Sequence, residues 1–148
     1  MKLVLPINYK KSLSKKSLYT DIDRIKAIID CELLERKAGN INLQGQEIFY
    51  SSTQESNEWN IFKFIDEGNF SVSENNDHVV INYRISIGGL IVKAVMIALI
   101  GMIFNRSIWA GPVFLFGVGG INLAIIYFRH LNLLKKIVSK VNVSACTY

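Results

Sequence analysis

The chain has 148 residues, of which 17 are Lys or Arg and 12 are Asp or Glu, so its formal net charge is +5, and half of its residues are hydrophobic. This length allows one domain of ordinary size, or a smaller domain joined to a membrane element. Its two cysteines, Cys31 and Cys146, lack metal-type spacing and exclude a disulfide framework, so we expect reduced thiols.

Charge is divided unevenly along the chain. All 12 acidic residues lie at or before Asp77; residues 1–84 carry 11 basic residues and are nearly neutral, whereas residues 85–148 carry 6 basic residues and no acidic one. Membrane segments with basic flanks give this pattern regularly. We therefore expect one part of the chain in water and another in lipid. The start, MKLVLPINYKK, has too short an apolar run for a signal peptide, and we expect none.

A short apolar run at residues 2–7, broken by Pro6, predicts an edge strand. The segment after it carries four lysines among serines: Lys10, Lys11, Lys15 and Lys16. We interpret this segment as a solvated loop, with contact to anionic lipid as the main alternative. We expect no nucleic acid, because aromatic residues are not interleaved with the lysines.

An amphipathic helix is predicted after Thr20, which has the hydroxyl of an N-cap. Apolar residues spaced near 3.6 support it: Ile22, Ile25, Ile29 and Leu33. Gly39 is expected to take the left-handed conformation that ends this helix.

From residue 40 the hydrophobic period changes to two. We predict strands in residues 40–52, with a break near Gly45, and in 59–65, 70–74 and 78–87. The order is β-α-β-β-β-β, which predicts an α+β domain over residues 1–87: a small antiparallel sheet with one amphipathic helix on one face.

Two apolar stretches follow, at residues 85–104 and 107–128, and the second has no charge. A hydrocarbon core of about 30 Å needs about 20 helical residues. Because only the short turn of residues 105–107 joins the stretches, we predict a transmembrane helical hairpin over residues 88–129, with spans at 89–106 and 108–128 and a joint at Gly88-Gly89. Residues 130–148 form a basic amphipathic tail that either continues the second span or lies along the inner leaflet.

Lys93 interrupts the first stretch about one turn from its start, where its stem reaches back to the headgroups. The alternative, a charge in a substrate or proton path, requires a partner, and neither span contains an acid.

Basic residues flank the outer ends of the hairpin: Arg84, Lys93, Arg129, Lys135 and Lys136. The positive-inside rule then predicts a two-pass protein of the cell inner membrane with both termini in the cytoplasm. Trp109 and Tyr127 are the expected anchors at the membrane interfaces.

Small residues form a face on each predicted span: Ala94, Ala98 and Gly101 on the first, Gly117, Gly120 and Ala124 on the second. We interpret these faces as the contact within the hairpin, and the alternative is contact with a partner's helices. Asn122 is a polar residue at mid-depth that requires a hydrogen-bond partner on a neighbouring helix.

The sequence contains no catalytic constellation that we recognise, so we predict no enzyme activity, no cofactor and no metal site. We hypothesise an accessory or scaffold subunit of a bacterial membrane assembly, whose partners are membrane lipid and other membrane-protein subunits. A self-assembling pore or membrane-active protein of the toxin or holin kind, and a membrane-bound enzyme with an unidentified site, remain the alternatives.

Overall fold

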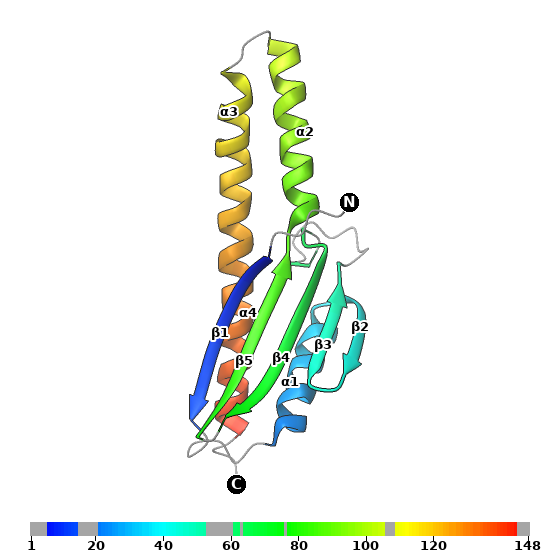
Figure 1. Cartoon of the computed structure of the whole chain (residues 1–148), viewed down its shortest axis with the longest axis vertical. Helices are drawn as coiled ribbons and strands as arrows, with labels where there is room; N and C mark the ends of the chain where they lie inside the picture. Colours follow the sequence, from blue (N-terminus) through cyan, green and yellow to red (C-terminus); the bar gives the residue numbers. More distant parts are fainter. Residues whose placement is uncertain are drawn as a thin grey trace.

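The computed structural model describes residues 6–14, 21–52, 61–62, 64–75, 77–105 and 109–144. Five antiparallel strands form one sheet in the order β1-β5-β4-β3-β2, which confirms the predicted α+β class (Figure 1). The strands are β1 (Pro6–Ser14), β2 (Gly39–Gln44), β3 (Glu47–Ser51), β4 (Glu67–Asn75) and β5 (His78–Ser86). The helices are α1 (Ile22–Glu35), α2 (Gly88–Asn105), α3 (Ala110–Phe114), a π-helical segment η2 (Leu115–Gly119) and α4 (Gly120–Ser144).

Strand β5, which lies between β1 and β4, follows the predicted alternation. One face of it is buried beneath the helices, namely Val79, Ile81, Tyr83 and Ile85. Its register fixes the ends of the sheet: Ser86 lies opposite Pro6 of β1, and His78 lies opposite Ser14. The sheet therefore has one end next to the start of α2 and another end far from it.

The predicted strand at residues 59–65 is wrong in the part that the structure describes. Ile61, Phe62 and Phe64 lie in turns, and Phe62 and Ile65 are buried. The element order is still as predicted, because the break at Gly45, where φ is +58°, divides residues 39–51 into two strands. A buried turn produced the same apolar pattern as a strand.

Helix α1 ends two residues earlier than expected. Lys37 takes the left-handed conformation with φ of +58°, and the Ala38 amide donates to the Leu33 carbonyl at 2.9 Å. Gly39 is needed for a different reason, since a Cβ there would lie 2.2 Å from the Ser52 carbonyl oxygen. The predicted N-cap Thr20 lies outside the described residues.

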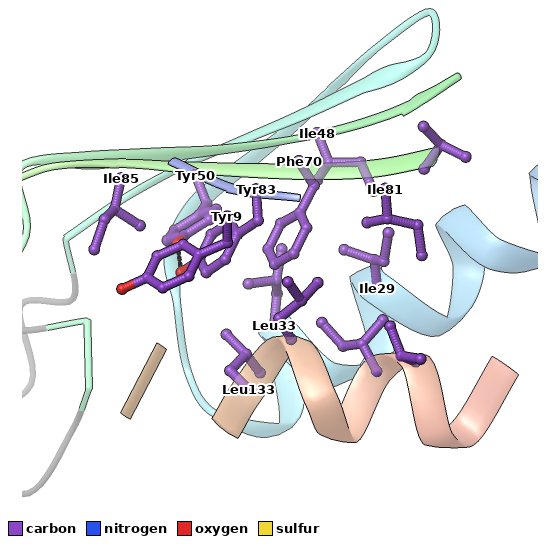
Figure 2. Packing of buried hydrophobic residues seen from close by; sticks show 14 of the residues in the cluster. Tyr9, Ile29, Leu33, Ile48, Tyr50, Phe70, Ile81, Tyr83, Ile85 and Leu133 are labelled. Carbon is purple, nitrogen blue, oxygen red and sulfur yellow. Dashed lines mark hydrogen bonds between the residues drawn. The ribbon is translucent and has the colours of Figure 1, made fainter. Parts of the chain in front are cut away.

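Two helices, rather than the predicted single helix, cover the inner face of the sheet. The second half of α4 packs beside α1, and its buried residues are Leu133, Leu134, Ile137, Val138 and Val141. Figure 2 shows Leu133 of α4 together with Ile29 and Leu33 of α1 beneath the strand side chains. A five-stranded sheet is roughly 19 Å wide and a helix about 10 Å, so two helices are needed. The described part of the tail, to Ser144, thus continues α4, which is one of the two arrangements expected for it, and its apolar face belongs to the core.

Helix α2 and the helical stretch that leads into α4 extend beyond the sheet. Figure 1 shows α2 and the stretch formed by α3, η2 and the start of α4 side by side above it. Helix α2 begins at Gly88, at the predicted joint. There the Gly89 amide donates to Asp66 Oδ2 at 2.9 Å, and a Cβ on Gly89 would lie 2.4 Å from Asp66 Oδ1. Glycine at this position lets a carboxylate cap the helix.

Candidate functional site

The projecting hairpin of α2 with α3, η2 and the first half of α4 is the first candidate surface. Within the described part of the chain, one continuous helical stretch, Gly111–Asn142, is long and apolar enough to cross a membrane. The apolar helix Gly88–Phe104 is shorter and does not meet that length. The prediction of two qualifying spans is therefore corrected to one.

Large apolar side chains on this hairpin are exposed. The most exposed are Phe104 at 83 %, Trp109 at 79 %, Phe116 at 77 % and Ile103 at 74 %. Further exposed positions cover the rest of both helices: Val92, Val95, Met96, Ile97, Leu99, Ile100, Val113, Ile121, Ile125 and Phe128. Water-soluble monomers rarely expose a continuous apolar surface of this extent.

On α2, the predicted packing face is found at the contact with its neighbour. Ala98 is buried, Ala94 and Gly101 are half-buried, and Ala94 Cβ lies 3.7 Å from the position of a Cβ on Gly119. Close approach also occurs at Gly111, where a Cβ would lie 2.4 Å from Met102 Sδ.

On the second helical stretch, the predicted face of small residues does not make the contact within the hairpin. Gly117, Gly120 and Ala124 are exposed, and a Cβ on either glycine would meet nothing within 4 Å. Residues 115–119 form a π-helical turn, which holds more residues than an α-helical turn and so changes which ones face α2. Gly111 and Gly119 take the contact positions instead. Asn122 is exposed as well.

The predicted interface residues lie at several levels of the molecule. Trp109 and Tyr127 are exposed at opposite ends of the second stretch, Lys93 and Arg84 are exposed near the joint, and Arg129 is half-buried. Lys10 and Lys11 are exposed on β1, and Lys135 is exposed on α4. Lys15 and Lys16 lie outside the described residues.

A buried chain of hydrogen bonds joins the sheet to α4 just below the hairpin. The hydroxyls of Tyr50 on β3 and Tyr83 on β5 are 2.5 Å apart, as the dashed line in Figure 2 marks, and Tyr83 also bonds Nδ1 of His130. His130 Nε2 lies 3.2 Å from the Ile61 carbonyl oxygen. A carbonyl only accepts, so Nε2 carries the proton and Tyr83 donates to Nδ1. Tyr50 then donates to Tyr83, and the chain is complete.

The side chains joined by these hydrogen bonds are buried, and their burial determines their protonation. Tyr50 has room because it lies opposite Gly68, where a Cβ would lie 2.2 Å from the tyrosine ring. Burial lowers the pKa of His130 to about 4, against the raising effect of the Ile61 carbonyl, so the ring is neutral near pH 7. Burial raises the pKa of Tyr50 and of Tyr83.

Tyr9 of β1 makes a second connection to α4. Its hydroxyl donates to the Tyr127 carbonyl oxygen at 3.1 Å, and its ring stacks on that of Tyr83 at 5.5 Å between centroids. Burial raises its pKa. The Tyr9, Tyr50, Tyr83 and His130 side chains, here called the junction cluster, attach three strands to α4 where it leaves the sheet.

A cluster of charges joins α1 to α4 further from the hairpin. The Glu32 carboxylate is buried; its Oε2 lies 3.2 Å from Arg36 Nε and its Oε1 lies 3.1 Å from Lys136 Nζ, while Lys140 also pairs with Oε1. Burial raises the Glu32 pKa, but the contacts with Lys140, Lys136 and Arg36 outweigh it and bring it to about 2. Lys136, predicted to contact lipid, thus has a protein partner.

His130 and Glu32 were both missed as structural residues, although spacing could have found them. His130 precedes Leu133, Leu134 and Ile137 by three, four and seven residues, so it shares their helix face. Glu32 follows Ile25 by seven and Ile29 by three residues, which again places a polar residue on the buried stripe.

Within the described ranges, no group of three His, Cys, Asp or Glu side chains is arranged to hold a metal ion. None of the family models, curated proteins or solved structures compared with the chain gives a significant match.

Proposed function

We propose that the hairpin crosses a bacterial inner membrane twice and holds the α+β domain in the cytoplasm, where the protein acts as an accessory or scaffold subunit of a membrane assembly. The observation that carries the proposal is the exposed apolar surface of the hairpin. A lipid bilayer is the solvent that such a surface requires, because both helices are apolar on nearly all sides.

The lengths of the two helices are compatible with two crossings. Helix α2 has 18 residues, which corresponds to about 27 Å at 1.5 Å per residue, close to a hydrocarbon core of about 30 Å. Spanning helices range from about 17 to 25 residues. The second crossing uses the stretch from Trp109 to Phe128, whose ends carry the two aromatic anchors Trp109 and Tyr127.

Polar features of the hairpin agree with this placement. Lys93 is exposed five residues after the start of α2, so its side chain reaches back to the headgroups. Arg84 and Arg129 lie at the same end of the hairpin, which by the positive-inside rule is the cytoplasmic end.

The proposed subunit role is supported by the outward-facing small residues Gly117, Gly120 and Ala124. These residues leave the contact within the hairpin to Gly111 and Gly119, so their small side chains are available for close approach by a partner's helix. The pore alternative has less support, because the exposed side chains of the described hairpin are almost all apolar, with Lys93 and Asn122 as polar exceptions.

Thiol labelling tests the topology. Cys31 is exposed on α1 and is a natural reporter for the domain. With Cys146 changed to Ser, a membrane-impermeant maleimide should label Cys31 only after the membrane is opened. In a variant carrying Arg106→Cys and Cys31→Ser, the label should react in intact spheroplasts. Labelling of Cys31 in intact spheroplasts, or recovery of the protein in the soluble fraction, would contradict the proposal.

Extraction in mild detergent tests the subunit role. The protein should elute with other membrane subunits, and Gly117→Leu with Gly120→Leu should release them, because the larger side chains hold a neighbouring helix away. Ile121→Leu on the same helix is the matched control and should retain them. A chain that always elutes alone as a monomer would exclude a scaffold role.

A further inference from the structure

The two edges of the sheet differ in a way that bears on partner binding. Strand β2 is short, with six residues, and its register with β3 shifts between Gly39 and Asn42. Strand β1 has nine residues that pair with β5 in one unbroken register from Pro6 to Ser14. Figure 1 shows β1 at the outer edge of the sheet, with α4 behind it. Its outer side offers the longer row of backbone groups, without a register shift, for a further strand.

The side chains of this edge carry positive charge on both faces. Tyr9 and Leu13 point to the core, so Lys11 shares their face, whereas Lys10 points to the opposite face. Both lysines are exposed. The sequence has no acidic residue before Asp21, so nothing within β1 balances these charges.

These lysines are poorly placed to bind lipid. Lys10 is four residues along β1 from Pro6, the position opposite Ser86 at the end of the sheet next to α2. At about 3.3 Å per residue this places Lys10 roughly 13 Å from that end, beyond a Debye length of about 8 Å. The charge on β1 therefore lies beside the sheet, away from the proposed bilayer surface.

A second copy of this chain is also a poor partner for the edge. Lys10 is the middle residue of β1, so antiparallel pairing of two β1 strands would bring Lys10 of one copy directly opposite Lys10 of the other, with the two Lys11 side chains diagonal to each other. Like charges directly opposite in a sheet are destabilising.

We propose that β1 binds an extended acidic segment of a partner protein, which adds to the sheet as a sixth strand. This inference rests on the proposed scaffold function and names its partner class. Two consecutive Asp or Glu residues in the segment point to opposite faces of the new strand, one towards Lys10 and the other towards Lys11. Main-chain bonds supply the affinity and the paired charges select the segment.

The test uses the full chain in detergent micelles and three synthetic peptides of about ten residues, built of alternating Thr and Val with a central Glu-Glu, Gln-Gln or Lys-Lys pair. Fluorescence anisotropy should give a dissociation constant about tenfold lower for Glu-Glu than for Gln-Gln, from two opposite-charge pairs. This advantage should shrink as salt is raised. Hydrogen exchange should slow in residues 7–14 of β1, with β2 unchanged.

Charge reversal provides the decisive comparison. The double variant Lys10→Glu with Lys11→Glu should lose the Glu-Glu peptide and gain the Lys-Lys peptide, whereas Lys135→Glu, an exposed reversal on α4, should keep the original preference. Equal binding of all three peptides, protection at β2, or an unchanged preference in the double variant would overturn the proposal. If native partners stay bound to the double variant, the scaffold function holds and the edge proposal fails.

Discussion

The two halves of α4, before and after His130, each contain seven hydrophobic residues, among ten and fourteen positions, but have opposite surroundings. Before His130, side chains such as Ile121 and Phe128 are exposed, whereas after it Leu133, Ile137 and Val141 are buried against the sheet. The first half is apolar on nearly all sides, with Asn122 as an exposed exception, and the second half has one apolar stripe with lysines on its other faces. The comparison teaches that the distribution of apolar residues around a helix, more than their number, distinguishes the exposed half from the core-facing half.

The largest effect is expected where the core half of α4 is truncated. Ile137 is fully buried, so Ile137→Ala removes contacts and leaves a cavity that costs about 2–5 kcal/mol of unfolding free energy. Denaturant unfolding followed by circular dichroism in micelles measures this loss. The matched variant Ile121→Ala, in the exposed half, should stay within about 0.5 kcal/mol of the parent. Equal losses would remove the distinction between the halves.

Adding a lysine to α4 should have the opposite pattern of cost: large in the first half and small at an exposed position in the second half. Ile121→Lys places an ammonium group inside the proposed bilayer and should cost about 2.5–3.5 kcal/mol of insertion free energy. Asn132→Lys, at an exposed position beside the sheet, should insert like the parent. Glycosylation reporters fused to the chain measure the inserted fraction. Normal insertion of Ile121→Lys would show that this half does not face lipid.

The unfolding free energy should depend on pH through His130, which lies at the boundary between the two halves of α4. The pKa of His130 is lowered from 6.5 to about 4, so the unfolded chain binds a proton that the folded chain does not bind in this range. The unfolding free energy should therefore fall as the pH is lowered from 6.5 to 4, by up to about 3 kcal/mol.

His130→Phe is the variant that isolates this effect. It should be less stable near pH 7, because the Tyr83 hydroxyl and the Ile61 carbonyl lose their partner, but its unfolding free energy should vary less between pH 6.5 and 4. Parallel profiles for the parent and His130→Phe would assign the acid response to other groups.

The smallest effect is expected at the joint between β5 and α2. Asp66→Ala removes the carboxylate that accepts from the Gly89 amide and should cost about 1 kcal/mol, as loss of an N-cap usually does. Asp66→Asn keeps an accepting oxygen and is the control. Denaturant unfolding should order the parent, Asp66→Asn and Asp66→Ala by decreasing stability; a neutral Asp66→Ala would mean that water caps α2 equally well.

Local patterns in the sequence were sufficient for most elements. The stripe of Ile22, Ile25, Ile29 and Leu33 predicts α1, and the alternation of residues 78–86 predicts β5. The start of α2 at Gly88 follows from the glycine pair between the alternating residues of β5 and the apolar run that begins at Leu90. These features depend on neighbours along the chain, so a window of a few residues contains the information.

Features that depend on distant contacts were not predicted. The apolar stripe of Leu133, Ile137 and Val141 fits a membrane surface as well as a sheet, and the choice depends on how much of the sheet α1 leaves uncovered. The π-helical turn at 115–119 moved the packing face from Gly117 and Gly120 to Gly119, a change that small-residue spacing alone does not report. Predicting the junction cluster would have required knowledge of how three strands are registered with one another and with α4.

The uninterrupted course of α4 has a mechanical consequence. From Gly120 to Ser144 it is one helix, fixed to the sheet by the junction cluster and by the Glu32 contacts, so tilting or rotating its upper turns turns the whole sheet with it. Helix α2 reaches the same sheet through Gly88-Gly89, where the Gly89 amide donates to Asp66 and Leu90 and Ile91 pack against the core. In the proposed two-pass arrangement, a change in bilayer thickness that tilts α4 would therefore reorient the α+β domain and swing its β1 edge through a measurable angle.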